Sequence, residues 1–222
     1  MAIDPYWSNV VLNLRFEGAD GSTSFVDDKG NTVTPTGATI STAHFKYGSS
    51  SGYFHLGTYI TAATTAIEGS TAFTLEKWVY PTATIGDDRC IYETRGGSGW
   101  VFFINSSGYL QVYDSIAGLQ AASSVQIPVN TDTHIALERT IGSSYVTYYV
   151  NGTAAGGFTL ASFATATQIR IGARADGAAA YNGYLDDYRV TIGVARYGGN
   201  FTPAPIWDGI SSVNNSNFFE FF

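Results

Sequence analysis

The chain has a single cysteine, Cys90, which excludes an internal disulfide framework and any metal site built from several cysteines. Charged residues make up 13% of the sequence, about half the ~25% of average soluble domains. No uninterrupted apolar run approaches the ~20 residues with which a helix crosses a bilayer. We therefore expect a fold without disulfides or membrane insertion, in which Cys90 is a small buried hydrophobe.

Basic residues are also scarce, with 11 Lys and Arg against 18 Asp and Glu and a formal net charge of -7. This sign opposes the neutralisation of phosphates, so we expect no nucleic-acid partner. The first residues lack both the basic start and the apolar stretch of a secretory signal. We therefore expect assembly in a cytoplasm and not secretion.

Aromatic residues reach 15% and glycine contributes 25 residues of the 222. Apolar segments are short, rich in β-branched and aromatic residues, and bounded by turn residues, which is typical of strands. Hairpin turns are predicted at residues 105–108 and at Asn151-Gly152, and no segment has a clear helical period. The predicted fold class is all-β, a two-sheet antiparallel sandwich, with strands near residues 10–16, 73–80, 91–94, 100–104, 109–113, 145–150, 168–172 and 184–192.

The composition changes once, after Pro205, where a C-terminal tail (206–222) begins. The first predicted strand, at residue 10, separates an N-terminal arm (1–9) from the β-sandwich domain (10–205). Each phenylalanine near the end of the tail is worth roughly 2 kcal/mol on burial. We predict that the tail and the tryptophans flanking the domain bind a partner, although the tail could instead add a strand to its own sheet. The predicted partner-binding residues are Trp7, Trp207, Phe218, Phe219, Phe221 and Phe222.

Three stretches, in order, resemble the laminin-G-like, concanavalin A-like jelly-roll superfamily. Residues 72–81 are similar to that family's strand in which a tryptophan and an aromatic residue precede proline. Residues 133–152 are similar to its hairpin that ends in Tyr-Val-Asn-Gly, and residues 169–190 to its closing strand with two aspartates and an arginine. The resemblance implies a two-sheet jelly roll.

The flanks, residues 4–12 and 193–203, resemble the form of this domain found in tailed-phage virion proteins. This resemblance implies a non-enzymatic virion structural protein, such as a capsid decoration or cement protein or a head-fibre or tail component. Such a protein would act through contacts with capsid or tail proteins and with copies of itself, in a virion assembled in the host cytoplasm. The alternative is a glycan-binding adhesin module for attachment to the host surface.

Enzymes of the wider superfamily, the glycoside hydrolases, usually carry their acids on one strand as Glu-x-Asp-x-x-Glu, with two carboxylates facing across a cleft. The chain has no such run, and Glu76, Glu93 and Glu138 stand alone on separate predicted strands. We therefore predict no catalytic residues and no enzymatic activity.

A structural calcium ion is the cofactor that the resemblance implies, held between an early loop and the last strand. The matching residues here are Asp28, Asn31 and Asp187, whose oxygens suit a hard cation. Alternatively, residues 27–31 form a simple hairpin turn, and Asp186 or Asp187 pairs with an arginine. Both interpretations stay open, and no cofactor is required.

Glycan binding would use exposed aromatic rings as a platform, with acids or amides for the sugar hydroxyls. The candidates are Trp100, Tyr113 and Tyr181, together with Asp176 in the glycine-rich loop that precedes Tyr181. Because aromatic residues in a sandwich more often fill the core, the same rings could instead be buried.

Overall fold

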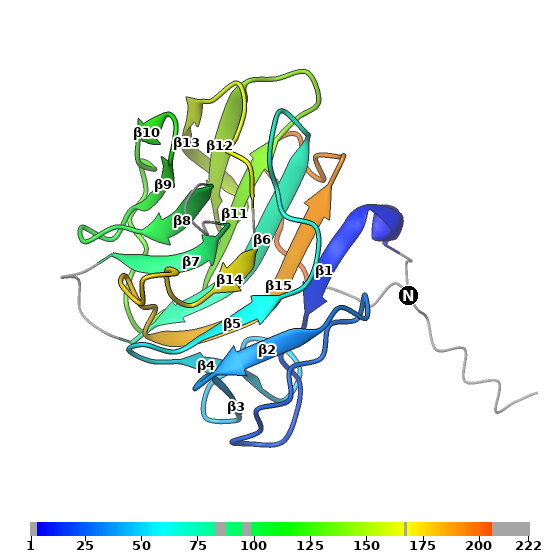
Figure 1. Ribbon diagram of the computed structural model, residues 1–222, viewed down its shortest axis with the longest axis vertical. Coiled ribbons are helices and arrows are strands. Elements are labelled where there is room, and N and C mark those ends of the chain that lie inside the picture. Colours follow the sequence, from blue (N-terminus) through cyan, green and yellow to red (C-terminus); the bar gives the residue numbers. More distant parts are fainter. Residues whose placement is uncertain (1–3, 83–87, 95–98, 167, 206–222) are drawn as a thin grey trace, which may run out of the picture.

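The computed structural model describes residues 4–82, 88–94, 99–166 and 168–205, which fold into two facing β-sheets (Figure 1). All pairings between the named strands are antiparallel, so the predicted all-β sandwich is confirmed. The one helix assigned in these ranges is the short 3-10 turn η1 (Trp7–Asn9). In the same ranges no helix has the length and apolar character needed to cross a membrane.

The first sheet, sheet A, is built around its two longest strands, β6 and β15, which lie side by side. Its order is β13 (Thr153–Thr159), β12 (Tyr145–Val150), β11 (Thr133–Arg139), β6 (Phe73–Pro81), β15 (Gly183–Ile192), β4 (Ser51–Phe54) and β3 (Thr39–Ser41), with β1 (Val10–Leu14) also paired to β15.

The second sheet, sheet B, packs against the inner face of sheet A. Its order is β10 (Gly118–Leu119), β9 (Leu110–Asp114), β8 (Trp100–Ile104), β7 (Arg89–Glu93), β14 (Ile169–Ile171), β5 (Tyr59–Ala62) and β2 (Val33–Thr36).

The core lies between the sheets because alternate residues of each strand point inward. On β8, for example, Trp100, Phe102 and Ile104 belong to the large buried cluster. The Trp100 ring centre lies 4.5 Å from that of Phe163 and 4.9 Å from that of Tyr92. The face of β8 that carries Val101 and Phe103 is therefore the outer face of sheet B.

Both predicted hairpin turns are confirmed. β8 and β9 pair across residues 105–109, where the Asn105 side chain accepts hydrogen bonds from the backbone N–H groups of Ser107 and Tyr109. Between β12 and β13, Asn151 and Gly152 both have left-handed φ, 49° and 76°. A side chain at position 152 would also collide with the carbonyl oxygen of Phe201, so glycine is required there.

The closing strand β15 contains a bulge between Asp186 and Arg189, opposite β6. Asp187 lies in the left-handed region, with φ of 46°. The bulge lets Leu185 and Tyr188, which differ in sequence parity, both point into the core. The Asp186 carboxylate stabilises the bulge by accepting hydrogen bonds from the backbone N–H groups of Lys46, Tyr47 and Asp187.

A buried ionic network covers the outer face of sheet A and holds both ends of the described chain. Arg189 donates to Glu76 at 2.8 and 2.9 Å and to Asp4 at 3.1 Å. Arg196 donates to the other oxygen of Asp4 at 2.6 Å. A residue before β1, Asp4, and a residue after β15, Arg196, are thus tied to the same sheet. The division of the chain at residues 9 and 205 stays a prediction.

Candidate functional site

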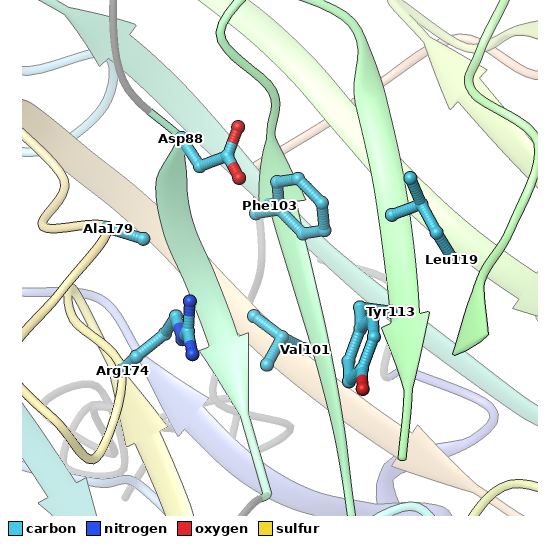
Figure 2. A pocket seen from close by; sticks show the side chains of 7 residues that line it. All are labelled: Asp88, Val101, Phe103, Tyr113, Leu119, Arg174 and Ala179. Carbon is cyan, nitrogen blue, oxygen red and sulfur yellow. The ribbon is translucent and has the colours of Figure 1, made fainter. Parts of the chain in front are cut away.

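A pocket of about 230 Å³ lies on the outer face of sheet B. Figure 2 shows Val101 and Phe103 of β8 at its centre, with Tyr113 and Leu119 toward one side and Arg174 and Ala179 toward the other. The residues that line it are Asp88, Val101, Phe103, Tyr113, Leu119, Arg174 and Ala179.

The floor of the pocket follows from strand alternation. Because Trp100 and Phe102 fill the core, Val101 and Phe103 must point outward, where they form a small cluster with Cys90. The expectation that Cys90 is a buried hydrophobe is confirmed. The next strand, β9, places Tyr113 directly opposite Val101, with 36% of the Tyr113 residue exposed.

One wall of the pocket comes from the loop that follows β14 and folds over sheet B. The carbonyl oxygen of Ala179 accepts a 2.7 Å hydrogen bond from the Cys90 N–H, which fastens this loop to β7. The carbonyl oxygen of Arg174 accepts hydrogen bonds from the Arg170 guanidinium and from the Gly177 N–H. The backbone that presents Arg174 to the pocket is therefore fixed by several contacts.

Charges of both signs stand at the rim of the pocket. The Arg174 guanidinium donates to Asp176 at 2.8 Å, and Asp176 also caps its own turn by accepting from the Ala178 N–H. The Asp88 carboxylate, elsewhere on the rim, accepts a 3.0 Å hydrogen bond from the backbone N–H of Ser106. The site thus combines an apolar base with one acid and one guanidinium that face the hollow.

Two of the four residues predicted for glycan binding lie at this pocket. Tyr113 lines it, and Asp176 pairs with Arg174 beside it. The prediction was wrong for Trp100 and Tyr181 as exposed platforms, because both residues have 0% exposure. Trp100 donates its Nε1–H to the Ile67 carbonyl at 2.7 Å, and Tyr181 donates its hydroxyl to the Tyr184 carbonyl at 3.1 Å.

The sequence interpretation missed Phe103 and Arg174. The alternation of residues 100–104 indicates that Trp100 and Phe103 point to opposite faces, so placing Trp100 in the core would have put Phe103 on the outer face. Arg174 carried no comparable signal, because it belongs to an irregular loop whose path is set by long-range contacts with β7.

The residues predicted for calcium make other contacts. The Asp28 carboxylate accepts hydrogen bonds from Arg15 at 2.8 and 3.0 Å and from the Asn13 amide at 2.8 Å. The Asn31 amide donates to the Val11 carbonyl and to Asp27, within a turn closed by the Gly30 N–H and the Asp27 carbonyl. Asp187 lies at the β15 bulge.

The contacts of Asp28 and Asn31 correspond to the hairpin-turn alternative, and Asp28 also pairs with Arg15. Among the described residues, no group of three or more His, Cys, Asp or Glu side chains could hold a metal ion. Calcium binding through Asp28, Asn31 and Asp187 stays a prediction.

Of the residues predicted to bind a partner, the structure describes Trp7. Trp7 lies in η1 and is half-buried, with the Lys29 Nζ 4.4 Å from the centre of its ring. The same Nζ donates a 2.9 Å hydrogen bond to the backbone carbonyl of Trp7. Trp207, Phe218, Phe219, Phe221 and Phe222 lie outside the described residues.

The isolated glutamates on sheet A are committed to structural contacts. Burial alone would raise the pKa of Glu76, but the adjacent Arg189, His134 and Arg196 hold that pKa well below its ordinary value. Glu138 accepts backbone hydrogen bonds from Arg196 at 3.0 Å, Tyr197 at 3.1 Å and Gly198 at 2.7 Å. The two carboxylates are buried, and their partners fasten the segment that follows β15 to sheet A.

Comparison with protein families gives a match to the concanavalin A-like lectin/glucanases superfamily over residues 51–194. This range contains all three motif stretches on which the sequence resemblance was based, so the predicted family is confirmed. The virion form of the domain, suggested by the flanking residues, is not part of this finding. No curated protein matches the chain.

Solved structures with similar folds are distant in sequence. Domain 4 of a GH43 extracellular arabinanase from Geobacillus stearothermophilus, solved in complex with arabinotriose, is 18% identical with a TM-score of 0.60 over 84% of this chain and 93% of that one. The binding domain of botulinum neurotoxin DC, solved in complex with SialylT, is 11% identical with a TM-score of 0.59 over 83% and 48%. The binding domain of botulinum neurotoxin serotype C1 is 11% identical with a TM-score of 0.57 over 84% and 49%. The chain thus spans nearly all of the arabinanase domain but about half of each neurotoxin domain.

Proposed function

Because the chain belongs to the concanavalin A-like lectin/glucanases superfamily, we propose that it is a non-enzymatic module that binds a glycan through the pocket on sheet B. The observation that carries this proposal is the meeting of an apolar floor, an exposed tyrosine and two charged side chains in one hollow (Figure 2). The adhesin interpretation of the sequence is thereby favoured over a purely structural role.

The chemistry of the pocket suits a sugar. One face of a sugar ring is made of C–H groups that pack on aromatic or aliphatic side chains, and the ring edge carries hydroxyls that need hydrogen-bond partners. Phe103, Val101 and Tyr113 offer the first kind of contact, and Asp88 and Arg174 the second. The volume of about 230 Å³ lies just below the ~300–1,000 Å³ of pockets for drug-sized ligands, and fits a small saccharide unit.

The site supports binding without catalysis. Hydrolysis of a glycosidic bond ordinarily uses two carboxyl groups that face each other across the substrate. Among the described residues that line the pocket, Asp88 is the one acid, and Asp176 at its edge is engaged by Arg174. The arabinanase domain solved with arabinotriose supports the idea that this fold serves sugar binding in a distant relative.

We place the module on a phage particle, as the flanking sequences suggest, where it would bind glycans of the host surface. Mass spectrometry of particles purified from a lysate of the encoding phage tests this placement. The chain is expected among the particle proteins in a fixed ratio to the capsid protein, and its absence would contradict the placement without touching the glycan proposal.

A structural role through protein–protein contacts is the second candidate. It is favoured by the Glu138 contacts, which hold residues 196–198 and so fix the start of the path toward the C-terminal tail. If the tail joins copies of the chain, a version ending at Pro205 should show a smaller mass by light scattering than the full chain. Equal masses would contradict a role of the tail in self-assembly.

The test of glycan binding compares two exposed tyrosines. Tyr113 lines the pocket, whereas Tyr145, which is 48% exposed, lies on strand β12 of sheet A. After a glycan array has identified a ligand, Tyr113→Ala should weaken its affinity by about tenfold, a typical value for an aromatic stacking contact of ~1 kcal/mol or more. Tyr145→Ala should leave the affinity unchanged.

Loss of affinity in both variants, or in neither, would contradict the pocket as the binding site. Far-ultraviolet circular dichroism of both variants confirms that each is folded before affinities are compared.

A further inference from the structure

Arg174 is the residue of the pocket whose hydrogen-bonding capacity is least used. A guanidinium has five N–H donors. In the described structure the Arg174 guanidinium donates one hydrogen bond, to Asp176, and 32% of the Arg174 side chain is exposed. Terminal N–H groups that are not used by Asp176 can therefore donate to an acceptor supplied by a ligand.

Several hydrogen bonds hold the backbone of the loop at Arg174. The Arg174 N–H donates to the Ala178 carbonyl at 3.1 Å, and the Arg174 carbonyl accepts from Arg170 at 3.0 Å and from Gly177 at 2.8 Å. Arg170 is itself held, with its guanidinium carbon 4.1 Å from the centre of the Tyr59 ring. Little ordering of the backbone is therefore needed when a ligand binds.

The rim of the pocket carries charges of both signs at two separate places. Figure 2 shows Arg174 and Asp88 at separate places on the rim, with the apolar floor of Val101 and Phe103 beside them. An anionic group on a ligand would be drawn to Arg174 and repelled by Asp88, while Asp88 would accept hydrogen bonds from hydroxyls. The pocket can therefore orient a ligand that has a carboxylate at one end and hydroxyls at the other.

We propose that the pocket prefers an acidic sugar, a uronic or sialic acid unit whose carboxylate pairs with the Arg174 guanidinium while its ring packs on Phe103 and Tyr113. This inference rests on the proposed glycan-binding function and assigns its ligand class. A carboxylate matches the planar fork of a guanidinium with two parallel hydrogen bonds, which a neutral hydroxyl cannot do.

The experiment is isothermal titration of the full-length chain with galacturonic acid, N-acetylneuraminic acid and neutral galactose, with acetate as a probe of the carboxylate alone. At least one acidic sugar is expected to bind ten times or more tightly than galactose, as for a hydrogen bond to a charged group. Acetate should bind far more weakly than that sugar, because it lacks the ring.

Three variants test whether Arg174 causes the preference for the acidic sugar. Arg174→Gln should lower the affinity for the acidic sugar by tenfold or more and the affinity for galactose by a clearly smaller factor, so that the preference for the acidic sugar is lost. Arg174→Lys keeps the charge but loses the planar fork, so it should retain part of the preference. Asp176→Asn keeps the oxygen that accepts from the Ala178 N–H but removes the competing charge, so it should raise the affinity for the acidic sugar.

The outcomes separate this inference from the proposed function. Galactose binding as tightly as the acidic sugars, with Tyr113→Ala weakening it, would overturn the acidic preference and leave the glycan site standing. An acidic preference that survives in Arg174→Gln would also overturn the assignment to Arg174. If none of a broad panel of neutral and acidic glycans binds, the proposed function fails and this inference fails with it.

Discussion

A lysine in the centre of the sandwich gives a prediction about stability that follows directly from the structure. Lys77 on β6 points between the sheets and is fully buried. Its Nζ lies 4.6 Å from the ring centre of Phe102 and 4.9 Å from that of Tyr188, and has no hydrogen-bond partner among the described residues. Burial lowers the pKa of the Lys77 ammonium well below its ordinary value, although Glu76 and Cys90 partly favour the charged form.

Because burial lowers the pKa of Lys77, the free energy of unfolding depends on pH. Between the lowered pKa of Lys77 in the folded chain and its ordinary pKa of ~10.4, the unfolded chain binds a proton that the folded chain lacks, so the free energy of unfolding rises with pH by up to ~1.4 kcal/mol per unit. The penalty disappears as pH rises past the unfolded pKa. Buried tyrosines such as Tyr92 and Tyr188, whose pKa values burial raises, act in the opposite direction above about pH 10.

Lys77→Met removes the amine and keeps a flexible side chain of similar length. We expect the variant to unfold in urea at higher concentration than the wild type at pH 7, by about 1–4 kcal/mol, as when buried charged groups are replaced by apolar ones. The difference between the two proteins should shrink as pH rises from 7 to 9, by at most ~1.4 kcal/mol per pH unit. Lys46→Met, which changes a lysine outside the core, is the matched control and should show no such pH trend.

A variant Lys77→Met that is less stable than the wild type at pH 7, or a stability difference independent of pH, would refute the argument that Lys77 is a buried amine without compensation.

Three further predictions concern other buried groups. Burial raises the pKa of Asp186 to about 6, against the backbone N–H groups of Tyr47 and Lys46 that lower it. Nuclear magnetic resonance titration of Asp186 should therefore find a midpoint near pH 6, and a midpoint near pH 4 would contradict the raised pKa. The free energy of unfolding should fall as pH rises from about 4 to 6, because in this range the folded chain binds a proton that the unfolded chain lacks. Glu138→Gln should cost about 1–3 kcal/mol in urea unfolding, because one oxygen that accepts backbone N–H groups becomes a donor, and no loss would show that these contacts contribute little. Trp100→Phe should lower stability by more than 1 kcal/mol without changing glycan affinity, whereas a large loss of affinity with unchanged stability would restore Trp100 as a binding platform.

The architecture was accessible from the sequence because its strand signals are local. Alternation and turn residues predicted the hairpin at residues 105–108 and the Asn151-Gly152 turn, and both depend on neighbouring residues alone. The irregular alternation around Leu185 and Tyr188 indicated a bulge or two-sided burial, and the structure contains the bulge. The family resemblance added the jelly-roll type to the two-sheet sandwich that the strand pattern had already predicted.

The site could be predicted only in part from the sequence, because its residues depend on which face of a strand packs against the other sheet. Composition cannot distinguish Trp100, which fills the core, from Tyr113, which lines the pocket. Arg174 reaches the pocket through a loop fastened by the hydrogen bond between Cys90 and Ala179, two residues far apart in the chain. Contacts of this kind are properties of the folded structure and leave no pattern within a short window of sequence.

The central claim, that the outer face of sheet B binds a glycan, is tested most directly by a crystal structure of the full chain with the tightest ligand from a glycan array. The account predicts a sugar ring on Phe103 and Val101, in contact with Tyr113, and within hydrogen-bond distance of Arg174 or Asp88. A glycan seated elsewhere, for example on the outer face of sheet A, with an empty pocket at Phe103, would contradict it.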